Sequence, residues 1–187
     1  LAVNELYANW IHEFGVLTVG RAPMHFGLGM QFNGGFGVFD HWLENRDLVA
    51  YKIVMGNFSV MPVIAKTYEG FLDEEDDVND YILQLSYGNP ETELEVGLIY
   101  QARRSTSNAN SNDTPTAPLG PTGTTLSDNY EVDSYNVFVS QWVEAVKVAF
   151  EVGFMSGNTG LAVNGAEISH DAFGGAVEIS WMPESSN

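Results

Sequence analysis

The stretch E-A-V-K-V-A-F-E-V-G-F, from Glu144 to Phe154, decides the fold of this chain. From Val146 onward every second residue is large and apolar, and the residues between are small or charged. Successive side chains of a strand point to opposite faces, so this stretch predicts a β-strand with one apolar face. In a soluble sheet that face would cover a core. In an outer-membrane barrel it would face lipid, and the charged residues would face the interior.

The same alternation recurs along the chain and predicts nine strands in all. It is cleanest in Asp80–Tyr87, in Glu93–Arg103 and in Phe173–Trp181. The other strands are expected at residues 5–11, 16–22, 47–55, 58–66, 131–142 and 146–154.

The connections between these strands alternate strictly in length. Short turns are expected near Gly15, Gly56, Asn89 and Glu144, and long loops at 26–46, 69–79, 105–129 and 156–170. A β-sandwich has no reason to place every long loop at one end, whereas an outer-membrane barrel has short periplasmic turns and long extracellular loops. We therefore predict one all-β domain over residues 1–187, an antiparallel up-and-down transmembrane β-barrel.

Two further features bear on this barrel. Aromatic residues cluster near the strand ends, as an interfacial girdle requires. Closed bacterial barrels normally have an even number of strands, so we expect the nine strands to be part of a larger barrel.

The composition excludes several classes of function. Acidic residues outnumber basic ones by 25 to 7, and the net charge of −18 argues against a nucleic-acid partner. The chain has no cysteine, its four histidines lack H-E-x-x-H spacing, and no G-x-S-x-G elbow is present. We expect no enzyme activity, no catalytic residue, no metal site and no cofactor.

An acidic run at Asp73–Asp77 is the one feature that suggests a cation site. Carboxylate oxygens are ligands for Ca²⁺ or Mg²⁺. The run lacks the D-x-D-x-D-G spacing of a calcium loop, so a solvated charged loop is the favoured interpretation.

Three segments carry a resemblance to a known family. They are V-G-R-A-P-M-H-F-G-L-G-M (Val19–Met30), F-D-H-W-L-E-N-R-D (Phe39–Asp47) and V-M-G-N-F-S-V-M-P (Val54–Pro62). Together they resemble porin-like outer-membrane proteins of Gram-negative bacteria. The likeness covers about a third of the chain in detail and the rest in pattern, and it implies a location in the outer membrane.

With the apolar faces outward, the polar faces of the strands would line the interior. The expected pore-lining residues are Arg21, Lys52, Lys66, Asp80, Gln84, Glu93, Glu95, Arg103, Asn136, Lys147, Glu151 and Glu178. Opposite charges on such a wall set which ions pass. The alternative is that they form salt bridges inside a plugged, non-conducting barrel.

The segment from Phe26 to Arg46 is too apolar to extend freely into water. One interpretation is that it folds inward and narrows the pore, with Asp40, Glu44 and Arg46 near the constriction. The other is that it packs on the outer rim or on a neighbouring protomer.

The sequence thus predicts a porin-like channel through which small hydrophilic solutes diffuse passively, with a preference for cations. Its expected partners are outer-membrane lipid and lipopolysaccharide, besides the solutes. A homo-oligomer or another envelope protein is left open as a further partner. The alternatives are a structural barrel that scaffolds another envelope component without an open pore, and, less favoured, a soluble β-sandwich binding module.

Overall fold

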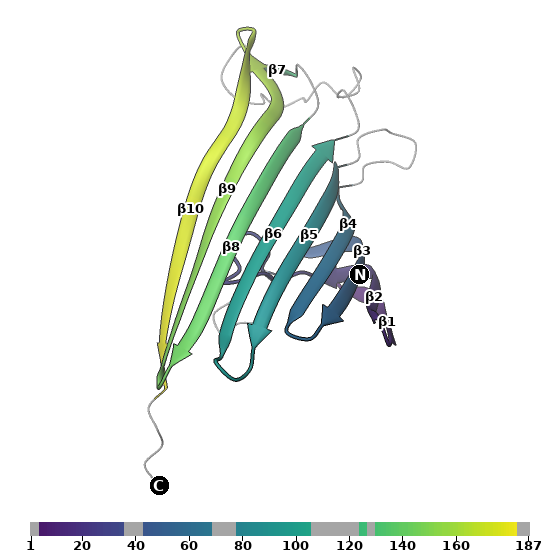
Figure 1. Cartoon of the computed structure of the whole chain (residues 1–187). Coiled ribbons are helices and arrows are strands. Elements are labelled where there is room, and N and C mark those ends of the chain that lie inside the picture. Colours follow the sequence, from purple (N-terminus) through teal and green to yellow (C-terminus); the bar gives the residue numbers. More distant parts are fainter. Residues whose placement is uncertain (1–3, 36–42, 69–77, 106–123, 127–129, 183–187) are drawn as a thin grey trace.

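The computed structural model describes residues 4–35, 43–68, 78–105, 124–126 and 130–182, and the strands among them form one antiparallel β-sheet (Figure 1). No helix among them is long and apolar enough to cross a membrane. The strands are β1 (Leu6–His12), β2 (Gly15–Pro23), β3 (Asn45–Met55), β4 (Phe58–Tyr68), β5 (Val78–Asn89), β6 (Leu94–Ser105), β7 (Thr124–Leu126), β8 (Glu131–Val143), β9 (Val146–Val163) and β10 (Ala166–Trp181).

Nine of these strands follow one another across the sheet in the order of the sequence. The path is β1-β2-β3-β4-β5-β6-β8-β9-β10, and each neighbouring pair is antiparallel. The short β7 lies off this path and pairs with β9 at Leu161–Val163. The prediction of an all-β, up-and-down sheet of nine strands is therefore confirmed.

The sheet is not closed into a barrel. Within the described residues β1 pairs only with β2, and β10 pairs only with β9, so both remain edge strands. The sheet nevertheless curls, and it curves around the segment that follows β2 (Figure 1). The described residues thus form an open, curved wall, and the larger barrel of which we expect the nine strands to be part stays a prediction.

The two ends of the sheet differ in their connections. Tight turns join β1 to β2, β3 to β4, β5 to β6 and β8 to β9 at one end, here called the turn end (Figure 1). Gly56, Glu93 and Glu144 adopt positive φ angles of 61°, 52° and 56° in three of these turns. The opposite end of the sheet, where β9 and β10 are joined by their hairpin turn, is here called the loop end.

The expected loop at residues 156–170 is wrong. These residues extend β9 and β10 into a long hairpin that ends in a two-residue turn at Asn164 and Gly165. Both turn residues have positive φ, 51° and 81°, as a type I′ turn requires. Asn-Gly is the strongest short-range hairpin signal, so the dipeptide outweighs the weak hydrophobic alternation around it.

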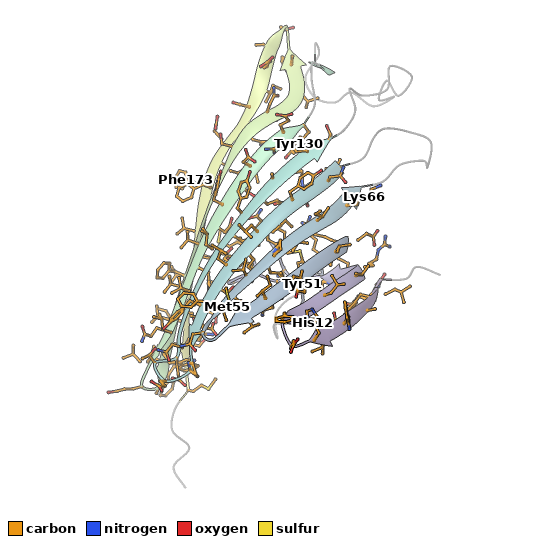
Figure 2. All side chains as sticks on the ribbon, turned by 45° about the vertical axis from the view of Figure 1, so that its right-hand side comes forward. His12, Tyr51, Met55, Lys66, Tyr130 and Phe173 are labelled. Atoms are coloured by element: carbon orange, nitrogen blue, oxygen red, sulfur yellow. The ribbon has the colours of Figure 1, made fainter. Side chains whose placement is uncertain are left out.

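The two faces of the sheet have opposite character. Large apolar side chains stand exposed on the outer face, here defined as the face turned away from the segment that follows β2 (Figure 2 labels Phe173 among them). Exposed side chains of this face include Leu83, Leu85, Leu98, Tyr135, Val137, Val148, Phe150, Phe154, Val177 and Ile179. The alternation that defines the strands therefore leaves the more apolar side of the sheet uncovered.

The packed core lies on the inner face. Residues of the segment after β2, among them Met24, Phe26 and Phe32, are buried against small and branched side chains of the wall. Those wall residues are Ala22, Leu48, Ala50, Val63, Ala65, Ile82 and Ile99. The segment and the inner face form one packed unit, and the candidate site lies between them.

Candidate functional site: the inner face and the crossing segment

Residues 24–35, here called the crossing segment, run across the inner face of the sheet (Figure 1). The segment begins after Pro23, which cannot donate a backbone hydrogen bond and so ends β2. Gly29 N donates to Phe26 O at 2.9 Å, and Phe26 N donates to Phe32 O at 3.1 Å. These bonds fold the segment into a compact loop.

His25 ties the two ends of this loop together. Gly34 N donates to His25 Nδ1 at 3.2 Å, and Nε2 of the same ring lies 3.1 Å from Gly27 O. Because Nδ1 accepts a hydrogen bond, Nε2 carries the hydrogen and donates to the carbonyl.

The wall is shaped to receive Phe26. This ring is 3% exposed and lies directly over Gly97 of β6. A Cβ at Gly97 would stand 2.8 Å from Phe26 Cε2, closer than packed atoms approach. The ring also meets Phe138 of β8 edge to face at 6.3 Å between centroids.

Glu151 of β9 holds the next part of the crossing segment. Its Oε2 accepts hydrogen bonds from Leu28 N at 2.8 Å and from Met30 N at 3.4 Å. Its Oε1 accepts one from Asn136 Nδ2 at 2.6 Å. The carboxylate is 0% exposed, so the segment covers it completely.

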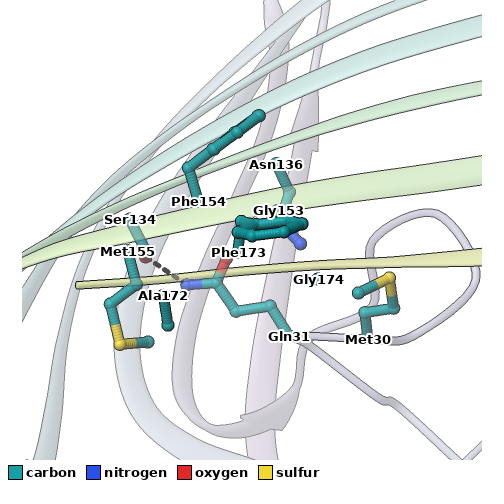
Figure 3. A pocket seen from close by; sticks show the side chains of 10 residues that line it. All are labelled: Met30, Gln31, Ser134, Asn136, Gly153, Phe154, Met155, Ala172, Phe173 and Gly174. Atoms are coloured by element: carbon teal, nitrogen blue, oxygen red, sulfur yellow. Dashed lines mark hydrogen bonds between the residues drawn. The ribbon is translucent and has the colours of Figure 1, made fainter. Parts of the chain in front are cut away.

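An amide and hydroxyl cluster secures the following residue. Gln31 Nε2 donates to Gln101 Oε1 of β6. It also donates to Ser134 Oγ of β8 (Figure 3). A cavity of about 280 Å³ opens beside this cluster, between the crossing segment and strands β8 to β10. Met30, Gln31 and Gly174 are among its lining residues (Figure 3).

A buried ion-pair network lies toward the loop end. Asp80 of β5 is 0% exposed and pairs with Arg46 of β3 and with Arg103 of β6, whose Nε lies 2.8 Å from Asp80 Oδ1. Arg46 also pairs with Glu44, and its guanidinium lies 4.9 Å from the ring centroid of Phe32. Two positive and two negative charges therefore neutralise one another beside the crossing segment.

The turn end of the inner face is more open. A cavity of about 450 Å³ is lined there by Glu93, Glu95, Ser140, Trp142 and Lys147, together with the turn after β5. Ser140 Oγ donates to Glu95 Oε2 at 3.4 Å. The exposed carboxylates of Glu93 and Glu95 give this end of the face an acidic character.

Most of the residues expected to line a pore share the inner face. Strand alternation and the pairing registers place nine of them there: Lys52, Asp80, Gln84, Glu95, Arg103, Asn136, Lys147, Glu151 and Glu178. Asp80, Asn136 and Glu151 are buried, so they are structural rather than accessible groups. Glu93 is not part of a strand and lies in the turn that precedes β6.

Arg21 and Lys66 are placed on the outer face, contrary to expectation. Arg21 pairs in register with Asp47, and Asp47 with Lys66, and these positions alternate with the inner-face residues Ala22, Leu48 and Ala65. Arg21 forms a two-point ion pair with Asp47, at 2.8 and 2.6 Å. The expectation was wrong because it assigned every charge to one face, whereas charges at strand ends can pair beside water on either face.

The candidates for the constriction are only partly placed. Asp40 lies outside the described residues. Glu44 directly precedes β3, and Arg46 belongs to that strand, where it is buried beneath the crossing segment. The segment that actually covers the wall is residues 24–35.

Several residues of this site were not anticipated from the sequence. Gln31, Gln101, Ser134 and Ser140 lie on or against the inner face. The three wall residues sit at the polar positions of alternating strands, which is the signal that could have identified them. Nothing in the local sequence indicates that the ring of Phe26 packs on Gly97.

The described residues contain no group of three or more His, Cys, Asp or Glu side chains that could hold a metal ion. In comparisons with protein-family models and with curated proteins, no match to this chain was found.

Proposed function

We propose that this chain forms part of the wall of a porin-like transmembrane β-barrel in the outer membrane of a Gram-negative bacterium. Small hydrophilic solutes, cations in preference, diffuse along its inner face, and the crossing segment narrows their path. The chain contributes no catalytic chemistry in this role.

The main support for the proposal is that the apolar face of the sheet is exposed while the polar face is turned inward, the reverse of a soluble protein. Large apolar side chains of the outer face are widely exposed, for instance Phe154 at 55%, Val177 at 71% and Phe173 at 84%. The opposite face holds carboxylates, guanidinium groups, amides and hydroxyls. An apolar surface of this extent, spread over neighbouring strands, needs an apolar environment, and lipid supplies one.

The difference between the two ends of the sheet supports the same arrangement in a membrane. Short turns close one end of the sheet, and the long β9–β10 hairpin extends from the other (Figure 1). Aromatic side chains gather on the outer face near the turn end, where Tyr51 stacks on His12 at 5.5 Å and Phe58 meets Tyr87 at 4.8 Å between centroids. Aromatic girdles of this kind mark the membrane interface in barrels.

The crossing segment favours a second candidate function. It buries Phe26 and Phe32 against the wall, and the adjoining ion-pair network is self-neutralising. A face covered in this way also suits a structural barrel that scaffolds another envelope component without an open pore.

Planar-bilayer recording on the full-length protein tests the first function against the second. An open pore predicts stepwise, ion-selective conductance with a reversal potential shifted toward that of the cation. Absence of conductance steps from protein shown to be inserted in the membrane would contradict the channel and favour the structural barrel.

A further inference from the structure

We propose that Glu151 is the positioning residue that fixes the crossing segment on the inner face, and that its carboxylate acts as a clamp rather than as an ion-selective wall charge. For its effect on solute passage, this inference rests on the proposed channel function. The docking of the segment is measured separately, so the positioning role of Glu151 and the channel function can fail independently.

The clamp is built from three donors that converge on one carboxylate. Leu28 N and Met30 N reach Oε2 from the segment, and Asn136 Nδ2 reaches Oε1 from the neighbouring strand β8. Within the described part of the chain no Lys or Arg side chain pairs with this carboxylate. The segment's own backbone therefore supplies most of the hydrogen bonding that a buried carboxylate requires.

Glycines on both sides make room for this contact. Gly27 has φ +57°, and a Cβ there would lie 2.7 Å from Glu151 Oε2. A Cβ at Gly153 would lie 2.9 Å from Asn136 Oδ1, so this glycine leaves the space that Asn136 occupies. The segment, the carboxylate and its supporting amide thus fit one another closely.

The position of the clamp distinguishes Glu151 from the other acidic residues of the inner face. Glu151 is 0% exposed, and no ion could reach it while the crossing segment is docked. Glu178 of β10 lies on the same face, is exposed, and accepts a hydrogen bond only from Ser180 Oγ among the described contacts. Glu178 is therefore a matched control, with the same charge and no contact with the segment.

Removing the carboxylate should release part of the segment only. In Glu151→Ala the amides of Leu28 and Met30 lose their acceptor, whereas Gln31 keeps Gln101 and Ser134, and Phe32 keeps Arg46. We expect local opening over residues 27–30 with the strands of the wall unchanged.

Amide hydrogen exchange of the full-length protein in lipid or detergent tests the clamp. We expect the Leu28 amide to exchange at least about tenfold faster in Glu151→Ala than in the unchanged protein. Amides of β8 and β9 and all amides of Glu178→Ala should keep their rates. Unchanged exchange at Leu28, or an equal rise across the wall strands, would overturn the proposal.

Two further variants keep the test decisive if Glu151→Ala does not fold. Glu151→Gln retains the shape and one acceptor oxygen, so it should give an intermediate rate at Leu28. Gly27→Ala would place a Cβ 2.7 Å from Glu151 Oε2 and 3.0 Å from the ring of Phe138 without replacing a wall residue, so it should also accelerate exchange at Leu28. A Leu28 rate equal to that of the unchanged protein in both variants would contradict the clamp.

Single-channel conductance then tests whether docking of the crossing segment affects the passage of solutes. We expect Glu151→Ala to alter the single-channel conductance and increase its fluctuations, while its cation preference shifts less than that of Glu95→Gln. A change confined to cation preference would make Glu151 a wall charge and contradict the clamp. If the unchanged protein does not conduct, the channel function fails while the exchange result still decides the clamp.

Discussion

Glu151 accepts a hydrogen bond from the backbone N–H of Leu28 at 2.8 Å, although 123 residues separate the two in the sequence. This bond joins the next-to-last strand of the sheet to the segment that follows the second. The wall and the crossing segment are consequently held together, with the polar face of the wall as the surface on which the segment packs.

The close contact between Gly97 and the ring of Phe26 predicts the effect of adding one methyl group at position 97. In Gly97→Ala the new Cβ would stand 2.8 Å from Phe26 Cε2, so the ring or the strand must shift. Overpacking of this kind costs about 1–3 kcal/mol of unfolding free energy. Reversible urea unfolding in lipid vesicles measures it.

Gly88→Ala is the matched control for this substitution. A Cβ at Gly88 meets nothing within 4 Å, so we expect a change of no more than about 0.5 kcal/mol. Equal losses of unfolding free energy for both variants would show that a backbone effect of replacing glycine, rather than the contact with Phe26, determines the cost.

The buried ion-pair network predicts a larger loss. Asp80→Asn removes the negative charge that pairs with Arg46 and Arg103, and Arg46 is 3% exposed. Breaking a buried pair from one side costs roughly 3–5 kcal/mol because the remaining charge stays buried. The same unfolding assay measures this cost.

Asp47→Asn is the control for an exposed ion pair. Asp47 pairs with Arg21 where both side chains are about half exposed, 50% and 48%. Water can solvate both charges after the substitution, so we expect little change in stability. A loss for Asp80→Asn as small as that for Asp47→Asn would argue against the buried network.

The exposed acidic residues of the inner face predict ion preference. Glu95 and Glu178 lie on this face and are accessible to solutes. Replacing both with Gln removes two negative charges from the path, so we expect the reversal potential in a salt gradient to move toward the non-selective value. An unchanged reversal potential would exclude these residues as determinants of selectivity.

The strand pattern could be read from the sequence because alternation is a local property. The predicted strand at residues 58–66 is observed as Phe58–Tyr68, and that at 131–142 as Glu131–Val143. The hairpin around Asn164 and Gly165 lies where a loop was expected, because the apolar alternation on either side of this Asn-Gly turn is irregular.

The candidate site could be predicted only in part. The inner-face position of Glu151 follows from the alternation of β9, but its burial depends on a segment far away in the sequence. Likewise, Arg21 alternates with apolar neighbours, and only the register with Asp47 reveals its outer-face position. Contacts between segments far apart in the sequence, unlike strand periodicity, cannot be predicted from a local sequence pattern.

The central claim is that the outer face meets lipid, and one substitution tests it most directly. Val137 lies at the middle of β8 on this face, 40% exposed, while Val143 lies at the turn end of the same strand, 63% exposed. Unfolding free energies of Val137→Arg and Val143→Arg in lipid vesicles should be compared. Arginine at the middle of the strand should cost about 2–4 kcal/mol and at the end about 0–1 kcal/mol. Equal and small losses at both positions would mean that this face meets water, and would contradict the membrane wall.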